Sequence, residues 1–206
     1  IVSKVLPSNA SHSGVLRACE RSLKRLRLDV IDLYLLHWPG SVPLKDTVAG
    51  FEQLRSEGRI RHWGVSNFDT ADMQQLWSLP AGPRCVANQV YYSASERGIE
   101  FDLLAWQRDH GVVTVAYSPI DQGALARDTT FATIGRRHRV SASTAALAWV
   151  LRREEVASAI VAERAMAALA PSLVGLAPEA AAASRQAFAD LLTAVGTPSY
   201  TALTEA

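Results

Sequence analysis

The feature that most constrains the fold is a regular alternation of short apolar strands and amphipathic helices. Residues 1–5 and 112–119 are typical of buried strands, because they are short, apolar and contain many β-branched side chains. Residues 12–28 carry apolar side chains at helical spacing with basic residues between them. Strict alternation predicts parallel strands, since each helix must return the chain over the sheet before the next strand begins.

Six strands and the helices between them account for most of the sequence. Gly58 suits a helix C-terminus, and Asp69 or Thr70, like Ser141, suits a helix N-cap. The expected strands cover residues 1–5, 29–38, 60–68, 84–92, 112–119 and 156–162. The expected helices cover residues 12–28, 44–58, 69–79, 100–111, 131–139, 141–153 and about 178–194.

Two architectures fit this order: an open doubly wound sheet and a closed (β/α)₈ barrel. No G-x-G-x-x-G motif follows any strand, which disfavours the open dinucleotide-binding sheet. Polar side chains instead follow strand after strand at the carboxyl end, and in a barrel these ends form the mouth where active sites lie. They are Lys4, His37, Ser66, Asn67, Gln89, Tyr117 and Ser118.

Composition excludes several classes of function. The 206 residues carry a net charge of +1, so no overall field favours nucleic acid or a membrane surface. No apolar run approaches the roughly 20 residues of a membrane helix, and no signal-peptide pattern is present. The two cysteines have no metal-ligand spacing and are too few for a disulfide framework, and the histidines show no metal spacing either. We expect no metal site and a cytoplasmic location.

Four blocks carry a family resemblance: DVIDLYLLHWP, EGRIRHWGVSNF, NQVYY and GVVTVAYSP. In this order and spacing the chain resembles the aldo-keto reductases, the NADPH-dependent carbonyl reductases built on a (β/α)₈ barrel, and it is most similar to bacterial members. The resemblance runs from residue 1 to about residue 160. It implies an α/β fold that is an incomplete (β/α)₈ TIM barrel, with six of eight units present and the first two missing.

The expected domain organisation follows from that resemblance. Residues 1–206 form a single partial barrel domain, in which residues 161–206 are a divergent helical segment. The sequence opens at Ile1, already inside an apolar run, so we expect it to be a fragment.

The resemblance also implies catalytic residues. Lys4 matches the family's catalytic lysine and His37 its histidine, while Trp38 is expected to line the substrate pocket. An ammonium beside a phenol favours proton transfer from it, and a neutral imidazole N–H can polarise a carbonyl. Taken alone, a histidine that ends a strand is more often a core residue bonded to backbone. The family's proton-donating tyrosine and its aspartate match no residue of this sequence.

Cofactor-binding residues are implied in the same way. Ser66, Asn67 and Gln89 match residues that hydrogen-bond the nicotinamide carboxamide, for which amide and hydroxyl groups are suited. Tyr117 matches the aromatic residue that stacks on the nicotinamide ring. The remaining matches are to the segment that contacts the pyrophosphate, namely Ser118 and the loop PIDQG with Ile120.

The region expected to bind the adenosine end departs from the family pattern. Ala162 stands where a lysine is usual, Ala168 where an arginine is frequent, and Ser172 in place of an asparagine; Arg164 is near and could compensate. The expected cofactor is therefore NADPH, with NADH also possible.

The predicted function is hydride transfer from NADPH to a small aldehyde or ketone, such as a 2-oxoaldehyde. The alternative is a catalytically inactive, reductase-like protein that binds the cofactor or a partner, because the segment with the proton donor has no match. The expected partner is a small carbonyl substrate, with no nucleic acid and no membrane. The sequence does not indicate the oligomeric state, the individual substrate or the direction of reaction.

The departure at residue 162 leads to a testable prediction. Ala162→Lys should restore a charge-assisted contact with the 2′-phosphate, worth roughly 1.5–3 kcal/mol, and so tighten NADPH about tenfold or more. Affinity for NADH should stay unchanged, because NADH lacks that phosphate. Titration of both cofactors against both proteins checks this, and equal NADPH affinities would contradict it.

Overall fold

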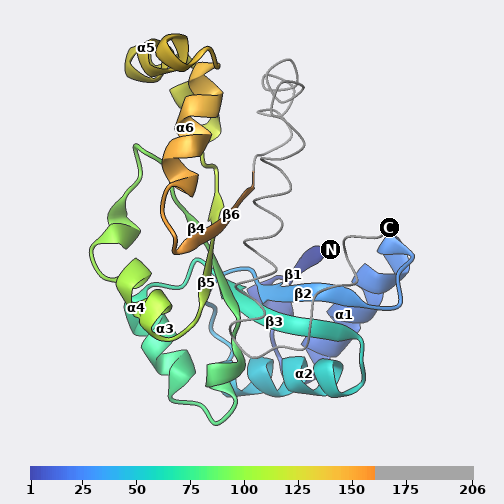
Figure 1. Cartoon of the computed structure of the whole chain (residues 1–206). Coiled ribbons are helices and arrows are strands. Elements are labelled where there is room, and N and C mark those ends of the chain that lie inside the picture. The colour runs from blue at the N-terminus through green and yellow to red at the C-terminus, as the bar shows by residue number, and fades with distance from the viewer. Residues whose placement is uncertain (161–206) are drawn as a thin grey trace. The chain divides into compact units, whose positions relative to one another are not determined.

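The structure is a computed structural model that describes residues 1–160. In this range parallel strands alternate with helices (Figure 1). The strands are β1 Val2–Val5, β2 Ile31–Leu36, β3 Ile60–Ser66, β4 Ala87–Tyr91, β5 Val113–Tyr117 and β6 Val156–Ile160. The α-helices are α1 His12–Leu26, α2 Leu44–Ser56, α3 Thr70–Trp77, α4 Leu103–Asp109, α5 Thr129–His138 and α6 Ala142–Leu151.

The described strands follow one another in the order β1-β2-β3-β4-β5-β6. The pairs β1–β2, β2–β3, β3–β4 and β5–β6 are parallel, so the predicted α/β class with parallel strands is confirmed. The chain divides into two compact units, one over Ile1–Gln89 and one that begins at Val90.

Two expectations lie outside the described residues. They are the helix at 178–194 and the adenosine-binding residues Ala162, Arg164, Ala168 and Ser172.

In the first unit, β2 is buried along its whole length. Strands of a parallel sheet are covered on both faces, and this explains why β2 is apolar except at Asp32, which pairs with Arg61 at 2.8 Å. The helices α1 and α2 lie side by side, with α1 contacting β1 and α2 contacting β3 (Figure 1). Apolar residues at helical spacing produce the buried stripe of α1, which includes Val15, Cys19 and Leu23.

Three aromatic rings form the centre of this unit. Phe51 of α2 contacts Tyr34 edge-on, with ring centroids 5.9 Å apart, and stacks on Trp63 of β3 at 5.5 Å. All three side chains are buried. Such ring pairs add about 0.5–1.5 kcal/mol each beyond the burial of their area, so this cluster holds α2 against β2 and β3.

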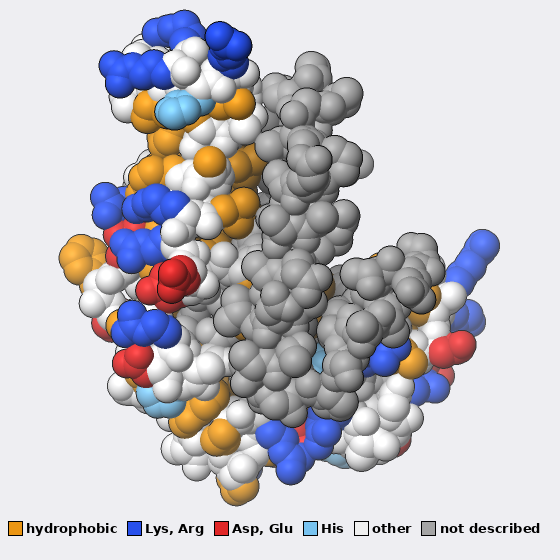
Figure 2. Space-filling model, in the orientation of Figure 1, with side chains coloured by type: hydrophobic (Ala, Val, Ile, Leu, Met, Phe, Trp, Pro, Cys, Tyr) orange, Lys and Arg blue, Asp and Glu red, His pale blue; other side chains and the backbone are white. Residues whose placement is uncertain are grey.

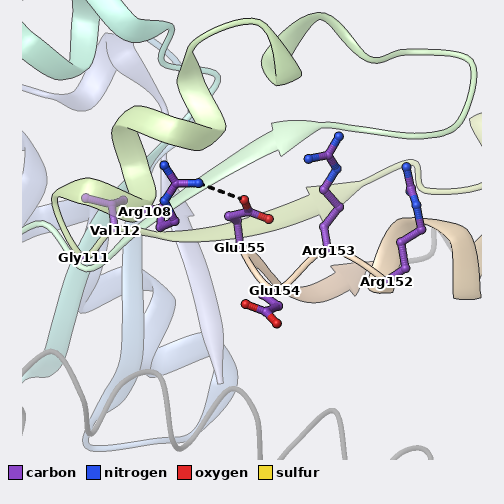
Figure 3. Close-up of a pocket in the computed structure, with 7 residues that line it drawn as sticks. All are labelled: Arg108, Gly111, Val112, Arg152, Arg153, Glu154 and Glu155. Atoms are coloured by element: carbon purple, nitrogen blue, oxygen red, sulfur yellow. Dashed lines mark ion pairs between the residues drawn. The ribbon is translucent and has the colours of Figure 1, made fainter.

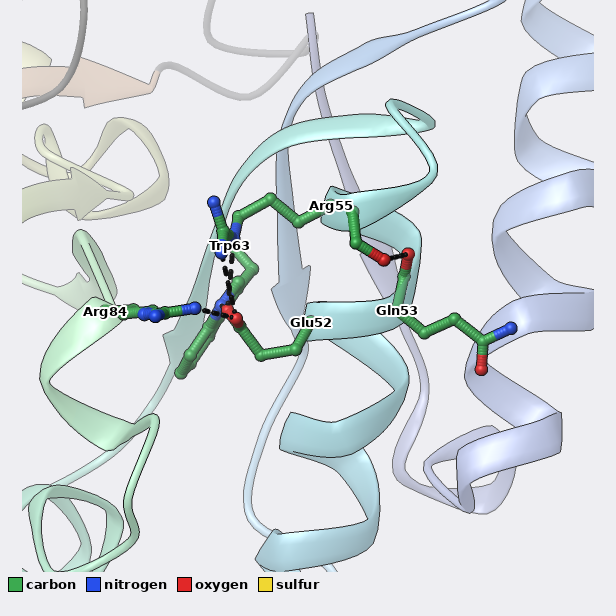
Figure 4. Close-up of polar contacts among 6 residues, drawn as sticks. Glu52, Gln53, Arg55, Trp63 and Arg84 are labelled. Atoms are coloured by element: carbon green, nitrogen blue, oxygen red, sulfur yellow. Dashed lines mark hydrogen bonds and ion pairs between the residues drawn. The ribbon is translucent and has the colours of Figure 1, made fainter.

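The carboxylate of Glu52, which is partly buried, joins this aromatic cluster to the rest of the unit (Figure 4). The indole Nε1 of Trp63 donates to Glu52 Oε1 at 2.7 Å, and Arg55 and Arg84 form ion pairs with the same carboxylate. Burial alone would raise the pKa of Glu52, but hydrogen bonds from Arg55, Trp63 and Arg84 outweigh it and hold that pKa below its usual value. Glu52 therefore stays ionised and links α2, β3 and the turn before β4.

The second unit contains β5, β6 and the helices α4, α5 and α6. Tyr92, Leu104, Ala116 and Val150 pack into one cluster with Val156. Basic residues gather over α5 (Figure 2), where Arg136, Arg137 and His138 occupy the last turn. Cations at a helix C-terminus complement its dipole and stay solvated.

Helix ends follow the predicted signals in most places. Asp69 caps α3 in a reciprocal capping box with Asp72, and Ser141 caps α6. Gly58, with φ of 71°, follows the C-cap of α2. Three predicted boundaries differ from the structure because short 3₁₀ turns occupy Gly82–Arg84 before β4 and Gly98–Glu100 before α4, and because Asp128 caps α5 two residues early.

Gly64 allows a close approach that leads to a second prediction. A Cβ added there would lie 2.3 Å from the backbone oxygen of Ala87 and 3.0 Å from Leu35 Cδ2. Gly64→Ala should therefore lower the free energy of unfolding by about 1–3 kcal/mol, as overpacked sites do. Urea unfolding measures the change. Gly98→Ala is the matched control, because its Cβ meets only the end of the Glu96 side chain at 3.4 Å; an equal loss in both variants would contradict the prediction.

Candidate active site

The predicted site residues of the first unit lie at the carboxyl ends of adjacent parallel strands. Lys4 is the third of four residues in β1 and pairs with Leu35, and His37 directly follows β2. Ser66 ends β3 and pairs in register with Gln89 of β4. Because the strands are parallel and in register, these polar residues come together at one end of the sheet, as the sequence predicted.

His37 extends the β1–β2 ladder by one residue. Its backbone N–H donates to Val5 O at 2.9 Å, which places the imidazole just beyond the apolar part of the strand. The ring lies 4.5 Å from the Trp38 ring, centroid to centroid, and Trp38 itself is 43% exposed. An exposed tryptophan against a strand-end histidine can contact a small ligand.

Burial and charge keep the histidine neutral. Partial burial, and then the positive charge of Lys4, lower the pKa of His37 below its ordinary value. Burial also lowers the pKa of Lys4. At neutral pH the imidazole is uncharged, so it can donate one N–H to a carbonyl oxygen without itself carrying charge.

Ser66 and Asn67 join three strand ends. Ser66 Oγ donates to Gln89 O at 2.7 Å, and the Asn67 backbone N–H donates to the same oxygen at 2.9 Å. The Asn67 amide Nδ2 donates to His37 O at 3.0 Å and to Ser66 Oγ at 3.2 Å. Asn67 has φ of 59°, a left-handed conformation that asparagine tolerates better than most residues. These bonds fix the positions of His37, Ser66 and Gln89 relative to one another.

This cluster fits a nicotinamide carboxamide. Ser66 and Gln89 are almost fully buried, so their polar atoms are held in one geometry. Together with Asn67 they carry hydroxyl, amide N–H and amide carbonyl groups, the types of donor and acceptor that a carboxamide requires. The residues present are therefore suited to the cofactor that the family resemblance implies.

The second unit carries the other predicted cofactor residues. Tyr117 ends β5, and its ring stacks on that of Tyr91 with centroids 5.4 Å apart. Ser118 follows with φ of 50°, and Ile120 is buried and anchors the loop. Tyr117, Ser118 and Ile120 thus lie together at the carboxyl end of β5, where they were expected.

Sequence reasoning missed a polar cluster beside Tyr117. Tyr91 and Ser95 both donate hydrogen bonds to the carboxylate of Asp121, in the loop after β5. The available signal was an acidic residue in that loop, within PIDQG, together with the hydroxyl-bearing run YYSAS, which starts at the last residue of β4. Neither segment alone shows that they meet.

A separate hollow of the second unit lies at the opposite end of its strands (Figure 3). Val112 and Glu155, which immediately precede β5 and β6, line it, and Glu155 pairs with Arg108 at 3.5 Å. Of the predicted site residues in the described part of the chain, none lines it. Active sites of parallel barrels lie at the carboxyl ends of strands, so this hollow is not the candidate active site.

Two further findings concern residues 1–160. No group of three or more His, Cys, Asp or Glu side chains in this range could hold a metal ion. No helix in this range is both long and apolar enough to span a membrane.

Comparisons with known proteins agree with this arrangement. The model of the aldo/keto reductase family matches residues 1–177. Methylglyoxal reductase YeaE of Escherichia coli is 47% identical over 161 residues, which are 76% of this chain and 57% of that protein. The NADH-specific methylglyoxal reductase of the same organism is 36% identical over 129 residues, which are 61% of this chain and 39% of that protein.

A solved structure extends the comparison to the fold. The aldo-keto reductase of Klebsiella pneumoniae in complex with NADPH superposes with a TM-score of 0.78 at 38% identity, covering 91% of this chain and 69% of that one. The chain belongs to the aldo/keto reductase family. It spans about half the length of the curated relatives it matches. The predicted fold class is confirmed, as an α/β chain that corresponds to part of the (β/α)₈ barrel of its relatives.

The coupling between Lys4 and His37 gives a third prediction. Lys4→Met removes a positive charge that opposes protonation of the imidazole, so the pKa of His37 should rise. It should remain below its ordinary value, because burial persists as the larger cause. NMR titration of the His37 ring protons measures this. Lys24→Met, on the exposed side of α1, is the control, and the same pKa in all three proteins would contradict the coupling.

Proposed function

We propose that the protein is an NADPH-dependent reductase of small aldehydes and ketones, with 2-oxoaldehydes such as methylglyoxal as the substrate class. The observation that carries this proposal is the placement of Lys4 and His37 on adjacent strand ends, beside the carboxamide-type cluster of Ser66, Asn67 and Gln89. Two relatives of this chain are methylglyoxal reductases, and this supports the substrate class.

The chemistry assigned to each residue follows from its environment. When bound, NADPH would supply the hydride for the carbonyl carbon. His37, held neutral by burial and by Lys4, donates its N–H to the carbonyl oxygen and orients the carbonyl for attack. Trp38, half exposed beside it, limits the pocket to small substrates. The carbonyl oxygen gains negative charge as hydride arrives, so a fixed donor at that atom stabilises the transition state more than the ground state.

Lys4 is assigned to proton transfer. In the family a tyrosine beside the lysine gives its proton to the carbonyl oxygen, and no residue of this sequence matches that tyrosine. An ammonium on β1 would favour the phenolate left behind after transfer. Lys4 is therefore the residue of this chain that we assign to proton transfer.

Each of the two units contains residues that we assign to cofactor binding. Ser66, Asn67 and Gln89 hold the carboxamide, and Tyr117 stacks on the nicotinamide ring. Ser118 and the loop with Ile120 contact the pyrophosphate through backbone N–H groups. NADPH is the proposed cofactor because a relative of known structure holds it, and the name of another relative shows that NADH is an accessible alternative within the family. A cytoplasmic location and a domain over residues 1–206 with a divergent segment at 161–206 remain predictions.

The fourth prediction tests the catalytic assignment. In the protein as its host makes it, Lys4→Met and His37→Ala should each lower kcat for methylglyoxal by about a hundredfold or more, the size expected when general acid–base or oxyanion groups are removed. NADPH oxidation followed by absorbance measures the rates, and thermal unfolding verifies that the variants fold.

The matched controls are Lys24→Met and His12→Ala, which alter exposed residues of α1. Both should retain the wild-type rate. Wild-type rates in Lys4→Met and His37→Ala would refute the assignment. NADPH binding without turnover of any carbonyl by the wild type would favour a cofactor-binding protein over a reductase.

A further inference from the structure

In the second unit, a carboxylate in the loop after β5 is bound by hydroxyl groups from the end of β4 and the turn that follows it. Tyr91, the last residue of β4, donates its phenol hydrogen to Asp121 Oδ1. Ser95 Oγ donates to the other carboxylate oxygen, Oδ2, at 2.9 Å. Both oxygens of Asp121 are thus bound by side chains that lie about 30 residues earlier in the chain. We refer to Tyr91, Ser95 and Asp121 as the loop clasp.

The loop held by the clasp has an unfavourable backbone. Ser118, Asp121 and Gln122 have φ of 50°, 50° and 51°. Left-handed conformations are unfavourable for residues with a Cβ, and they persist only where surrounding contacts impose them. Asp121 N–H donates to Ser118 O at 2.9 Å, and Ile120 is buried in an apolar cluster that includes Ala146 and Leu147 of α6. The clasp adds to these contacts two hydrogen bonds from the end of β4 and the turn after it.

The clasp also supports the aromatic ring at the end of β5. Tyr91 stacks on Tyr117 with an interplanar angle of 21°. A ring backed on one face can offer only its other face to a ligand. The hydrogen bond to Asp121 fixes the far end of the Tyr91 ring, so it sets the plane against which Tyr117 rests.

Charge considerations are consistent with this arrangement. A carboxylate in a loop that meets a pyrophosphate would repel it. Two hydroxyl donors hold the Asp121 carboxylate towards Tyr91 and Ser95. The bond to Asp121, and then burial, raise the pKa of Tyr91 to about 12, so the phenol keeps its hydrogen at any pH near neutrality.

We propose that Tyr91 and Asp121 are positioning residues for the nicotinamide cofactor, which act through the Tyr117 ring and the 118–123 loop. The proposal rests on the proposed function, because that function assigns the ring and the loop to the nicotinamide and the pyrophosphate. By ordering both before the cofactor arrives, the clasp lowers the conformational cost of binding.

The test is a set of NADPH affinities measured by quenching of protein fluorescence. Tyr91→Phe keeps the ring and removes only the hydroxyl, and it should raise the Kd for NADPH about threefold to tenfold, the range for one lost hydrogen bond. KM for NADPH should rise equally, while KM for methylglyoxal stays unchanged. Asp121→Ala removes the bond from Ser95 as well, so it should raise the Kd at least as much. The double variant should bind no more weakly than Asp121→Ala alone, because Asp121→Ala already removes the Tyr91 bond.

Two measurements separate positioning from a general loss of stability. Asp121→Asn keeps an oxygen that accepts from Tyr91, so it should recover most of the affinity. Tyr92→Phe is the matched control: Tyr92 is buried next to Tyr91 and donates to Glu100 at 2.7 Å, so its variant should lower Tm but leave the NADPH Kd unchanged. Without cofactor, amide hydrogen exchange over residues 118–123 should be faster in Tyr91→Phe than in the wild type.

The outcomes are distinguishable. If the wild type binds NADPH and Tyr91→Phe and Asp121→Ala bind it equally well, the clasp is not a positioning device and this inference fails alone. If Tyr92→Phe weakens NADPH as much as Tyr91→Phe, the effect follows stability and the inference also fails. If the wild type does not bind NADPH, the proposed function fails and the inference fails with it.

Discussion

The hydrogen bonds of Ser66 and Asn67 across the ends of β2, β3 and β4 are the interactions on which the candidate site depends. Gln89 O accepts from the Ser66 hydroxyl at 2.7 Å and from the Asn67 backbone at 2.9 Å, while the Asn67 amide reaches His37 O at 3.0 Å. Neighbouring strand ends otherwise continue into separate loops. Here they are bound to one another, and such supporting hydrogen bonds are what a binding or catalytic site requires to hold its polar groups in place.

The charges of Lys4 and His37 also shape the candidate site. Lys4 and His37 lie on adjacent strand ends, and both have a pKa below the ordinary value, chiefly because of burial. Two cations in one partly buried site would repel each other, so the histidine, with the lower intrinsic pKa, is the one that stays neutral. The site therefore holds an ammonium beside a neutral N–H donor. That pair suits a reaction in which negative charge develops on an oxygen atom.

Much of the fold and of the first unit's site could be predicted from the sequence, because both depend on local patterns. Alternating periodicities indicated parallel strands, and a parallel sheet brings Lys4, His37 and Ser66 to one end whatever the loops do. Contacts between distant loops were not predictable. Tyr91 meets Asp121 in a loop that has three left-handed residues, and Glu52 meets Arg84 in a 3₁₀ turn before β4; neither backbone feature was evident from the sequence. The roles expected for residues 162–172 lie outside the described residues.

The most direct test of the central claim is an NMR titration of the protein with NADPH, in which the side-chain amide signals of Asn67 and Gln89 are followed. The account predicts that both signals shift and saturate together as the carboxamide binds. The amide of Gln53, on the exposed face of α2 and bonded to Glu57, should not move. If NADPH binds and the signals of Asn67 and Gln89 stay in place, or if NADPH does not bind at all, the carboxyl ends of β3 and β4 are not a nicotinamide site.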